Sequence, residues 1–174
     1  YPDRVVAIHI NHQLQTAADD FEAHCVTTCR ALAVPLEVRR VTVDCGRRQS
    51  LEAQARAVRY DTLVTVAKQV NAAVVLLAQH AQDQLETVLI ALSRGAGLPG
   101  LSGMAPRFER SGVTFLRPIL SVQGQQIRAW LDRCSHAYVD DPSNQDTQFT
   151  RNRIRHAVLP ALEGALPGIA TAAA

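Results

Sequence analysis

Apolar residues follow two alternating patterns along this chain: short β-branched runs and longer stretches with helical spacing. Residues 5–10 (VVAIHI) form a nearly continuous apolar run, which is typical of a strand buried on both faces of a parallel sheet. Similar runs predict strands over residues 36–43 and 73–78 and an extended piece at FLRPIL. Helical spacing predicts helices over residues 17–33, 51–68, 82–94, 123–134 and 150–166, with Ser50 as the N-cap of the second.

The order of these elements predicts the fold class. Strands and helices alternate up to Gly95, which favours an α/β, Rossmann-like fold with a mostly parallel sheet and helices on both faces. A glycine-rich loop (GAGLPGLSGMAP) follows, and after FLRPIL the chain is mainly helical. We therefore expect an α/β domain over residues 1–120 and a helical extension of the same domain over residues 121–174.

Composition narrows the class of protein. The chain has 174 residues, 47% of them hydrophobic, enough for one buried core. Its net charge is only +2, so any RNA site must be local. Cysteines stand at positions 25, 29, 45 and 134 without a Cys-x-x-Cys pair, and no apolar run approaches the roughly 18 residues of a membrane span. We expect a cytoplasmic protein with reduced thiols and no membrane partner.

Polar residues at the carboxyl ends of predicted strands are the first candidates for chemistry, because ligands bind there in open α/β sheets. Asp83 and Glu86 follow the third strand and are three residues apart, so they share one helix face near His80. The two acids could hold Mg²⁺ on a nucleotide or bind the ammonium group of an amine substrate. They could equally serve only to complement the helix dipole.

Three other groups have simpler explanations. His9 and His12 would point to opposite faces of an extended chain, which favours satisfied polar residues over a metal pair. Glu52 and Arg56 have the spacing of an exposed helix pair. The basic segment RNRIRH could contact phosphate or RNA, or could be a solvated helix face.

Five ordered segments resemble the tRNA(Ile)-lysidine synthetases, which are pyrophosphate-loop ATP pyrophosphatases. The segments are HINHQL, EAQARAVRY, LLAQHAQDQLETVLIALSRGAGLPGLSGM, LRPIL and DPSNQDTQFTRNRIRHAVLPAL, and they span nearly the whole chain. The third is the most specific, with its His-x-x-Asp-Gln-x-Glu-Thr helix followed by Arg-Gly-x-Gly.

This resemblance implies an adenine nucleotide alpha hydrolase-like fold and an ATP-dependent ligase that modifies tRNA. ATP would adenylate the carbonyl oxygen of the wobble cytidine of tRNA(Ile) and release pyrophosphate; the ε-amine of free lysine would then displace AMP. The implied cofactors are ATP and Mg²⁺, and the implied partners are tRNA(Ile) and free lysine. A homodimer is left open.

The resemblance also implies roles for individual residues. The catalytic residues would be Asp83, Glu86 and Arg56, with Asp83 also a ligand of Mg²⁺. The nucleotide-binding residues would be His9, His80, Thr87, Arg94 and Gly95. The RNA or phosphate contacts would be Arg151, Asn152 and Arg155.

Two departures from the family pattern matter. The family's Ser-Gly-Gly-x-Asp-Ser loop, which grips pyrophosphate, appears nowhere in the 174 residues and is expected upstream of Tyr1; this predicts a polypeptide that is inactive alone. Gln82 stands where the family commonly has an acid. Two alternatives stay open: a tRNA cytidine thiolase of the same superfamily, which the lack of a Cys-x-x-Cys pair disfavours, and a non-catalytic nucleotide- or RNA-binding module.

Overall fold

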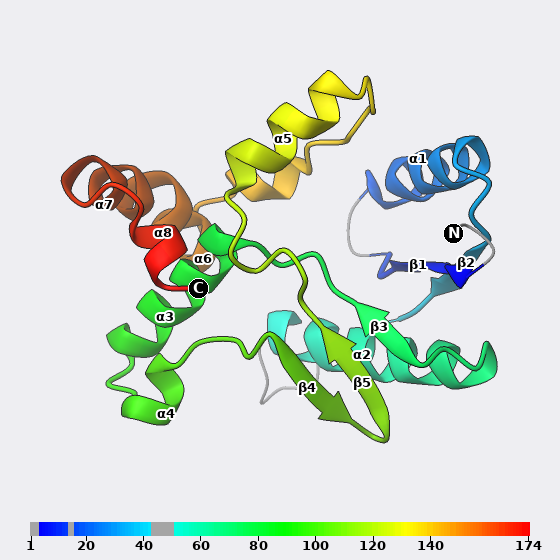
Figure 1. Ribbon diagram of the computed structural model, residues 1–174, viewed down its shortest axis with the longest axis horizontal. Coiled ribbons are helices and arrows are strands. Elements are labelled where there is room, and N and C mark those ends of the chain that lie inside the picture. Colours follow the sequence, from blue (N-terminus) through cyan, green and yellow to red (C-terminus); the bar gives the residue numbers. More distant parts are fainter. Residues whose placement is uncertain (1–3, 14–15, 43–50) are drawn as a thin grey trace. The chain divides into compact units, whose positions relative to one another are not determined.

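The computed structural model describes residues 4–13, 16–42 and 51–174 (Figure 1). The chain forms two compact units, residues 1–75 with 110–113 and residues 76–109 with 114–174. The division proposed at residue 120 stays a prediction. Cys45 and the predicted cap Ser50 lie outside the described residues.

The first unit is built around a pair of parallel strands. β1 (Ala7–Asn11) pairs with β2 (Leu36–Arg40), with Ala7 opposite Leu36 and Asn11 opposite Arg40. α1 (Ala18–Ala31) lies between them in sequence, as a parallel pair requires a crossover. α2 (Leu51–Gln69) follows, and its Val66 and Ala67 are fully buried.

A buried amide ties β1 to α1. Asn11 is 2% exposed, and its Nδ2 donates to Asp19 Oδ1 at 3.1 Å and to Glu22 Oε2 at 3.0 Å. Arg40 of β2 also donates to Glu22, from Nε at 3.1 Å and Nη2 at 2.8 Å. The bonds from Arg40 and then Asn11 lower the pKa of Glu22 to about 2, so this carboxylate is ionised at neutral pH.

A three-stranded sheet contains the remaining strands. β3 (Val74–Leu76), β4 (Arg107–Arg110) and β5 (Val113–Leu116) lie in the order β3-β5-β4. Ser111 and Gly112 join β4 to β5 with φ of 50° and 77°, as in a type I′ hairpin turn. β5 overlaps the extended piece predicted at FLRPIL (residues 115–120) only at Phe115 and Leu116, and residues 118–120 form a turn. β4 was not predicted.

The second unit is mainly helical. Its helices are α3 (Ala81–Ser93), α4 (Leu98–Leu101), α5 (Gly124–Arg133), the 3₁₀ turn η2 (Pro142–Gln145), α6 (Thr150–Arg153), the π-helical η3 (Ile154–Val158), α7 (Leu159–Ala165) and α8 (Ile169–Ala172). Ala81 and Leu85 of α3 pack with Leu159 of α7 and Ala170 of α8 in one buried cluster. This packing places the start of α3 beside the last helices of the chain (Figure 1).

The structure confirms most predicted elements. α1, α2, α3 and α5 agree with the predicted ranges within two residues at each end. The prediction of one helix over residues 150–166 is confirmed to within one residue, because α6, η3 and α7 follow one another without a gap from Thr150 to Ala165. Its middle turn, η3, is π-helical and lies just before Pro160, which lacks an N–H and whose ring clashes with the carbonyl four residues back in a regular α-helix. None of the helices in the described ranges is long and apolar enough to cross a bilayer.

Candidate functional site

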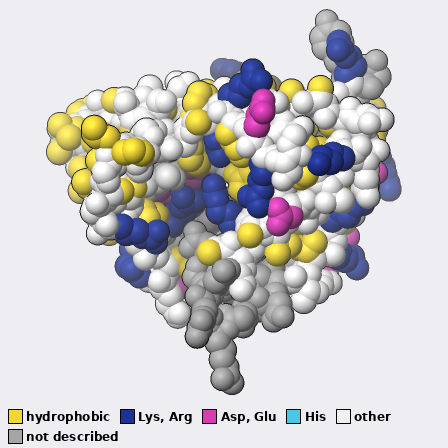
Figure 2. Space-filling model, turned by 90° about the horizontal axis from the view of Figure 1, so that it is seen from below, with side chains coloured by type: hydrophobic (Ala, Val, Ile, Leu, Met, Phe, Trp, Pro, Cys, Tyr) yellow, Lys and Arg dark blue, Asp and Glu magenta, His cyan; other side chains and the backbone are white. Residues whose placement is uncertain are grey.

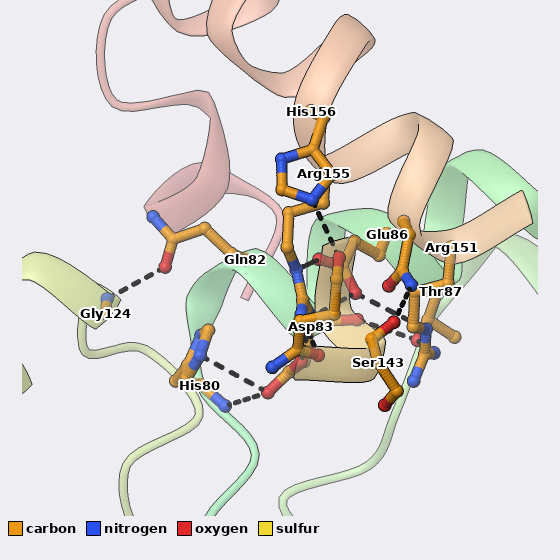
Figure 3. Close-up of polar contacts among 12 residues, drawn as sticks. His80, Gln82, Asp83, Glu86, Thr87, Gly124, Ser143, Arg151, Arg155 and His156 are labelled. Atoms are coloured by element: carbon orange, nitrogen blue, oxygen red, sulfur yellow. Dashed lines mark hydrogen bonds and ion pairs between the residues drawn. The ribbon is translucent and has the colours of Figure 1, made fainter. Parts of the chain in front are cut away.

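The start of α3 brings three predicted site residues together. His80 is the N-cap, and its backbone N–H donates to Asp83 Oδ2 at 3.1 Å (Figure 3). This bond satisfies one of the free N–H groups of the first turn. Glu86 lies one turn further on and is completely buried, whereas the Asp83 side chain is 18% exposed. The predicted grouping of His80, Asp83 and Glu86 is therefore present.

The buried Glu86 carboxylate is held by two arginines from α6 and η3. Arg155 Nε donates to Glu86 Oε1 at 2.7 Å and Arg155 Nη2 donates to Glu86 Oε2 at 3.1 Å, which makes a bidentate pair. Arg151 Nε lies 3.3 Å from Glu86 Oε2. Because both carboxylate oxygens are taken up in this way, the geometry favours a positioning role for Glu86 over direct contact with a substrate.

The same arginines reach the neighbours of Glu86 on α3. Arg155 Nη2 lies 3.4 Å from Asp83 Oδ1, and Arg151 Nη2 donates to Thr87 Oγ1 at 3.1 Å. Thr87 in turn donates to the carbonyl of Asp83 at 2.7 Å. The side chains of Arg151 and Arg155 are 31% and 30% exposed. Solvent therefore meets one carboxylate, Asp83, flanked by two guanidinium groups.

Burial and charge compete at this cluster. Burial raises the pKa of Glu86, and the hydrogen bond and charge of Arg155 oppose that rise without cancelling it. Burial would lower the pKa of Arg155, but its bond to Glu86 and the charge of Glu86 raise it overall. Arg155 thus stays cationic beside Glu86.

The turn η2 packs against α6 and η3. Asn152 is 7% exposed, and its Nδ2 donates to the carbonyls of Ser143 at 2.8 Å and Asp146 at 2.9 Å. His156 Nε2 lies 2.8 Å from the Asn144 carbonyl oxygen. Asn152 is thus committed to the turn, and its predicted contact with RNA stays a prediction.

Gln82 points away from the carboxylates. Its Oε1 accepts the backbone N–H of Gly124, the first residue of α5, at 2.8 Å (Figure 3). A helix N-terminus attracts an acceptor, and an acid at this position would fill the same place. The Gln82 side chain is therefore bound to the start of α5 and not to Asp83 or Glu86.

Both oxygens of Asp83 lie against N–H groups, Oδ2 against the backbone of His80 and Oδ1 against Arg155. Within the described ranges, no group of three or more His, Cys, Asp or Glu side chains could hold a metal ion. Mg²⁺ also binds through a single carboxylate together with nucleotide phosphates. The magnesium contact predicted at Asp83 stays a prediction.

Arg94 and Gly95 lie at the other end of α3. Arg94 is the C-cap, about 16 Å along the helix from Asp83 at 1.5 Å per residue, and Gly95 has φ of +67°. Hydrophobic side chains gather on the left of the face in Figure 2. Leu92 is 58% exposed and Leu98 85%. The nucleotide contacts predicted for Arg94 and Gly95 stay predictions.

Arg56 and His9 belong to the first unit. Arg56 lies 5.2 Å from the centre of the Tyr60 ring, and its Nη2 is 3.5 Å from the Tyr60 hydroxyl. His9 Nδ1 lies 3.4 Å from Cys25 Sγ, and burial lowers the pKa of His9 below 6.5, so its ring is neutral at pH 7. Their predicted catalytic and nucleotide-binding roles stay predictions.

Asn144 and His156 were not predicted as site residues. They come from the segments DPSN and RNRIRH, which the sequence singled out as motifs without separate roles for these two positions. The signal available in the sequence was the polar turn DPSN, which lies a few residues before the basic segment RNRIRH.

Known proteins resemble this chain closely. The profile of the PP-loop domain family matches residues 2–162. The tRNA(Ile)-lysidine synthase of Polaromonas naphthalenivorans is 47% identical over 96% of this chain and 51% of its own length. Those of Pseudomonas fluorescens and Burkholderia mallei are 45% and 40% identical over 92% and 98% of this chain, and 36% and 35% of their own lengths. The chain thus spans between about a third and a half of these relatives.

One solved structure shares the fold. The U34-tRNA thiolase NcsA from Methanococcus maripaludis, solved with its [4Fe-4S] cluster, superposes with a TM-score of 0.78 over 97% of this chain and 58% of that chain. At 13% sequence identity the likeness concerns the fold alone. It confirms the predicted α/β class with a parallel sheet, helices and a helical C-terminal segment.

Proposed function

The chain belongs to the PP-loop domain family, and on that premise we propose that it is the ATP-using part of a tRNA(Ile)-lysidine synthase. The family uses ATP. The proposed reaction joins free lysine to the wobble cytidine of tRNA(Ile) after ATP has adenylated the cytidine carbonyl oxygen. The 40–47% identity to lysidine synthases over nearly the whole chain supports this choice.

The observation that carries the chemistry is the contrast between Asp83 and Glu86. Glu86 is completely buried under Arg155 and Arg151, whereas Asp83 keeps 18% exposure beside the same guanidinium groups. Asp83 would attract the ammonium form of lysine and orient it. The ammonium group must lose a proton to solvent before it attacks. The amine then forms a C–N bond to the ring as the C–O bond to AMP breaks, and the surplus proton on that nitrogen also passes to solvent.

The arginines would act on phosphate. Arg151 and Arg155 are each about 30% exposed, so their outer N–H groups can meet the negative charge that develops as pyrophosphate and then AMP leave. Mg²⁺ would arrive on the ATP phosphates, and no step is assigned to it at Asp83. Arg56 is the proposed further phosphate contact from the first unit.

The test uses the full-length gene product that contains this chain, an unmodified tRNA(Ile) transcript, ATP and radiolabelled lysine. We expect lysine incorporation into the transcript together with pyrophosphate release. Asp83→Asn should lower kcat/KM for lysine about 100-fold and change pyrophosphate release less than threefold, because the variant loses the charge that attracts the amine.

Two outcomes would count against the proposal. Transfer of sulfur with no transfer of lysine would identify a thiolase. Loss of both half-reactions to the same degree in Asp83→Asn would place Asp83 in nucleotide binding instead. Glu109→Gln offers a matched control, since this exposed carboxylate on β4 contacts only Arg107 among the described residues.

A further inference from the structure

We propose that Asn144 is a positioning residue that holds Arg155 off Asp83 and so keeps this carboxylate open to a cationic amine. The inference rests on the proposed function, in which that amine is lysine. Asn144 contacts no reacting group itself; it acts through Arg155.

The first argument is the geometry of the Arg155 guanidinium. Its Nε and Nη2 donate to Glu86 at 2.7 and 3.1 Å, and its Nη1 donates to Asn144 Oδ1 at 3.1 Å. The remaining contact, from Nη2 to Asp83 Oδ1, is the longest at 3.4 Å. Asn144 therefore binds Nη1, the guanidinium nitrogen that does not contact Glu86. As a neutral acceptor, Asn144 does not cancel the charge of Arg155.

The second argument is that the Asn144 amide is itself fixed. Asp141 Oδ1 accepts the backbone N–H of Ser143 at 2.8 Å, which closes the η2 turn. Asn152 and His156 then bind the turn carbonyls of Ser143, Asp146 and Asn144 at 2.8 to 2.9 Å. The turn thus meets α6 and η3 at three points besides the Asn144–Arg155 bond, so the backbone that carries the Asn144 side chain is held in place.

The consequence concerns the charge on Asp83. Without the Asn144 amide oxygen, Nη1 of Arg155 has no acceptor in the η2 turn. The Arg155 guanidinium can then rotate about the edge that binds Glu86 and move closer to Asp83. A closer Arg155–Asp83 pair would compete with the ammonium group of lysine for the same carboxylate. Lysine affinity should fall while adenylation of the tRNA, which does not require lysine, continues.

The experiment compares the full-length wild type with Asn144→Ala, Asn144→Asp and the matched control Ser143→Ala. We measure KM for lysine in the incorporation assay and the rate of pyrophosphate release without lysine. Asn144→Ala should raise KM for lysine about tenfold and lower pyrophosphate release less than threefold, since Arg155 also faces the phosphates but Arg151 keeps its place. Asn144→Asp should restore KM, because its carboxylate offers Arg155 an oxygen at the same place.

Ser143→Ala alters the same turn without touching Arg155 and should behave as the wild type. An unchanged KM in Asn144→Ala, or a loss that Asn144→Asp does not repair, would overturn the inference. If Asn144→Ala does not fold, Asn144→Ser takes its place, since its side chain is too short to reach Arg155. A wild type that incorporates no lysine would refute the proposed function itself, which separates that failure from this one.

Discussion

At the N-terminal end of α3, Asp83 and Glu86 meet Arg151 and Arg155 from near the end of the chain, whereas at its C-terminal end Arg94 is exposed. Glu86 has no exposed surface, while Leu98, just beyond the helix, is 85% exposed. The two ends belong to one continuous motif in sequence. Only the first is surrounded by partners that fix side-chain geometry.

The difference shows where a reaction can be organised. A catalytic group must keep its orientation, and buried hydrogen-bonded pairs provide this because breaking them is costly. The C-terminal end offers exposed apolar side chains and a glycine turn, which are features of a contact surface. Variants at the two ends of α3 test whether the side chains at its N-terminal end are held more rigidly.

The largest effect is expected from Arg155→Ala. Removing Arg155 leaves the buried Glu86 carboxylate with Arg151 alone, at 3.3 Å, and we expect this to lower the unfolding free energy by about 3 kcal/mol. Urea unfolding of the full-length protein at pH 7 measures the loss. The effect is large because Arg155 makes two hydrogen bonds to Glu86, of 2.7 and 3.1 Å.

Arg94→Ala is the matched control at the other end of the same helix. The Arg94 side chain is exposed, so its removal should change the unfolding free energy by less than about 0.5 kcal/mol. Similar losses in both variants would show that the two ends of α3 do not differ in the way described.

Much of the fold could be predicted from the sequence, because the spacing of apolar residues marks the helices. The ranges of α1, α2, α3 and α5 were predicted to within two residues at each end, although no residue of α1 or α5 is buried. β4 was missed because three of the four residues in its sequence, RFER, are charged. The Ser111–Gly112 pair that follows β4 did mark a hairpin turn. The π-helical turn before Pro160 was not predicted, because helical periodicity continues on both sides of it.

The candidate site could be predicted only in part. The i,i+3 spacing of Asp83 and Glu86 on one helix face was sufficient to group them. Their unequal burial was not predictable, because it depends on Arg155, 69 residues further along the chain from Glu86. For the same reason RNRIRH was read as one basic patch, whereas Arg151 and Arg155 turn to Glu86 and Arg153 binds its own loop at Thr147 and Gln148.

A smaller effect should appear in the pH dependence of stability. The folded-state pKa of Glu86 is raised above its ordinary 4.5, chiefly by burial, so Glu86 contributes stability that is present below that value and lost as the pH rises through its folded pKa. Glu86→Gln cannot titrate. The unfolding free energy of the wild type should therefore fall relative to Glu86→Gln as the pH rises from 4.5.

Urea unfolding of both proteins at half-unit pH steps up to neutrality measures this slope. A wild type that instead gains stability relative to Glu86→Gln would mean that Arg155 and Arg151 outweigh burial. Asp83 belongs to the same cluster, so the comparison is repeated in an Asp83→Asn background to isolate the titration of Glu86.

The smallest effect is expected from Gln82→Glu. Gln82 Oε1 accepts the N–H of Gly124 at the start of α5, and a carboxylate there would interact more strongly with the positive end of the helix dipole. The unfolding free energy should rise by about 0.5 kcal/mol at low salt, and high salt should remove the gain. Because the side chain points away from Asp83, KM for lysine should stay within twofold of the wild-type value. A larger change in KM would mean that position 82 faces the carboxylate cluster after all, and the ordered N-terminal end of α3 would then extend to an acid that this chain has replaced.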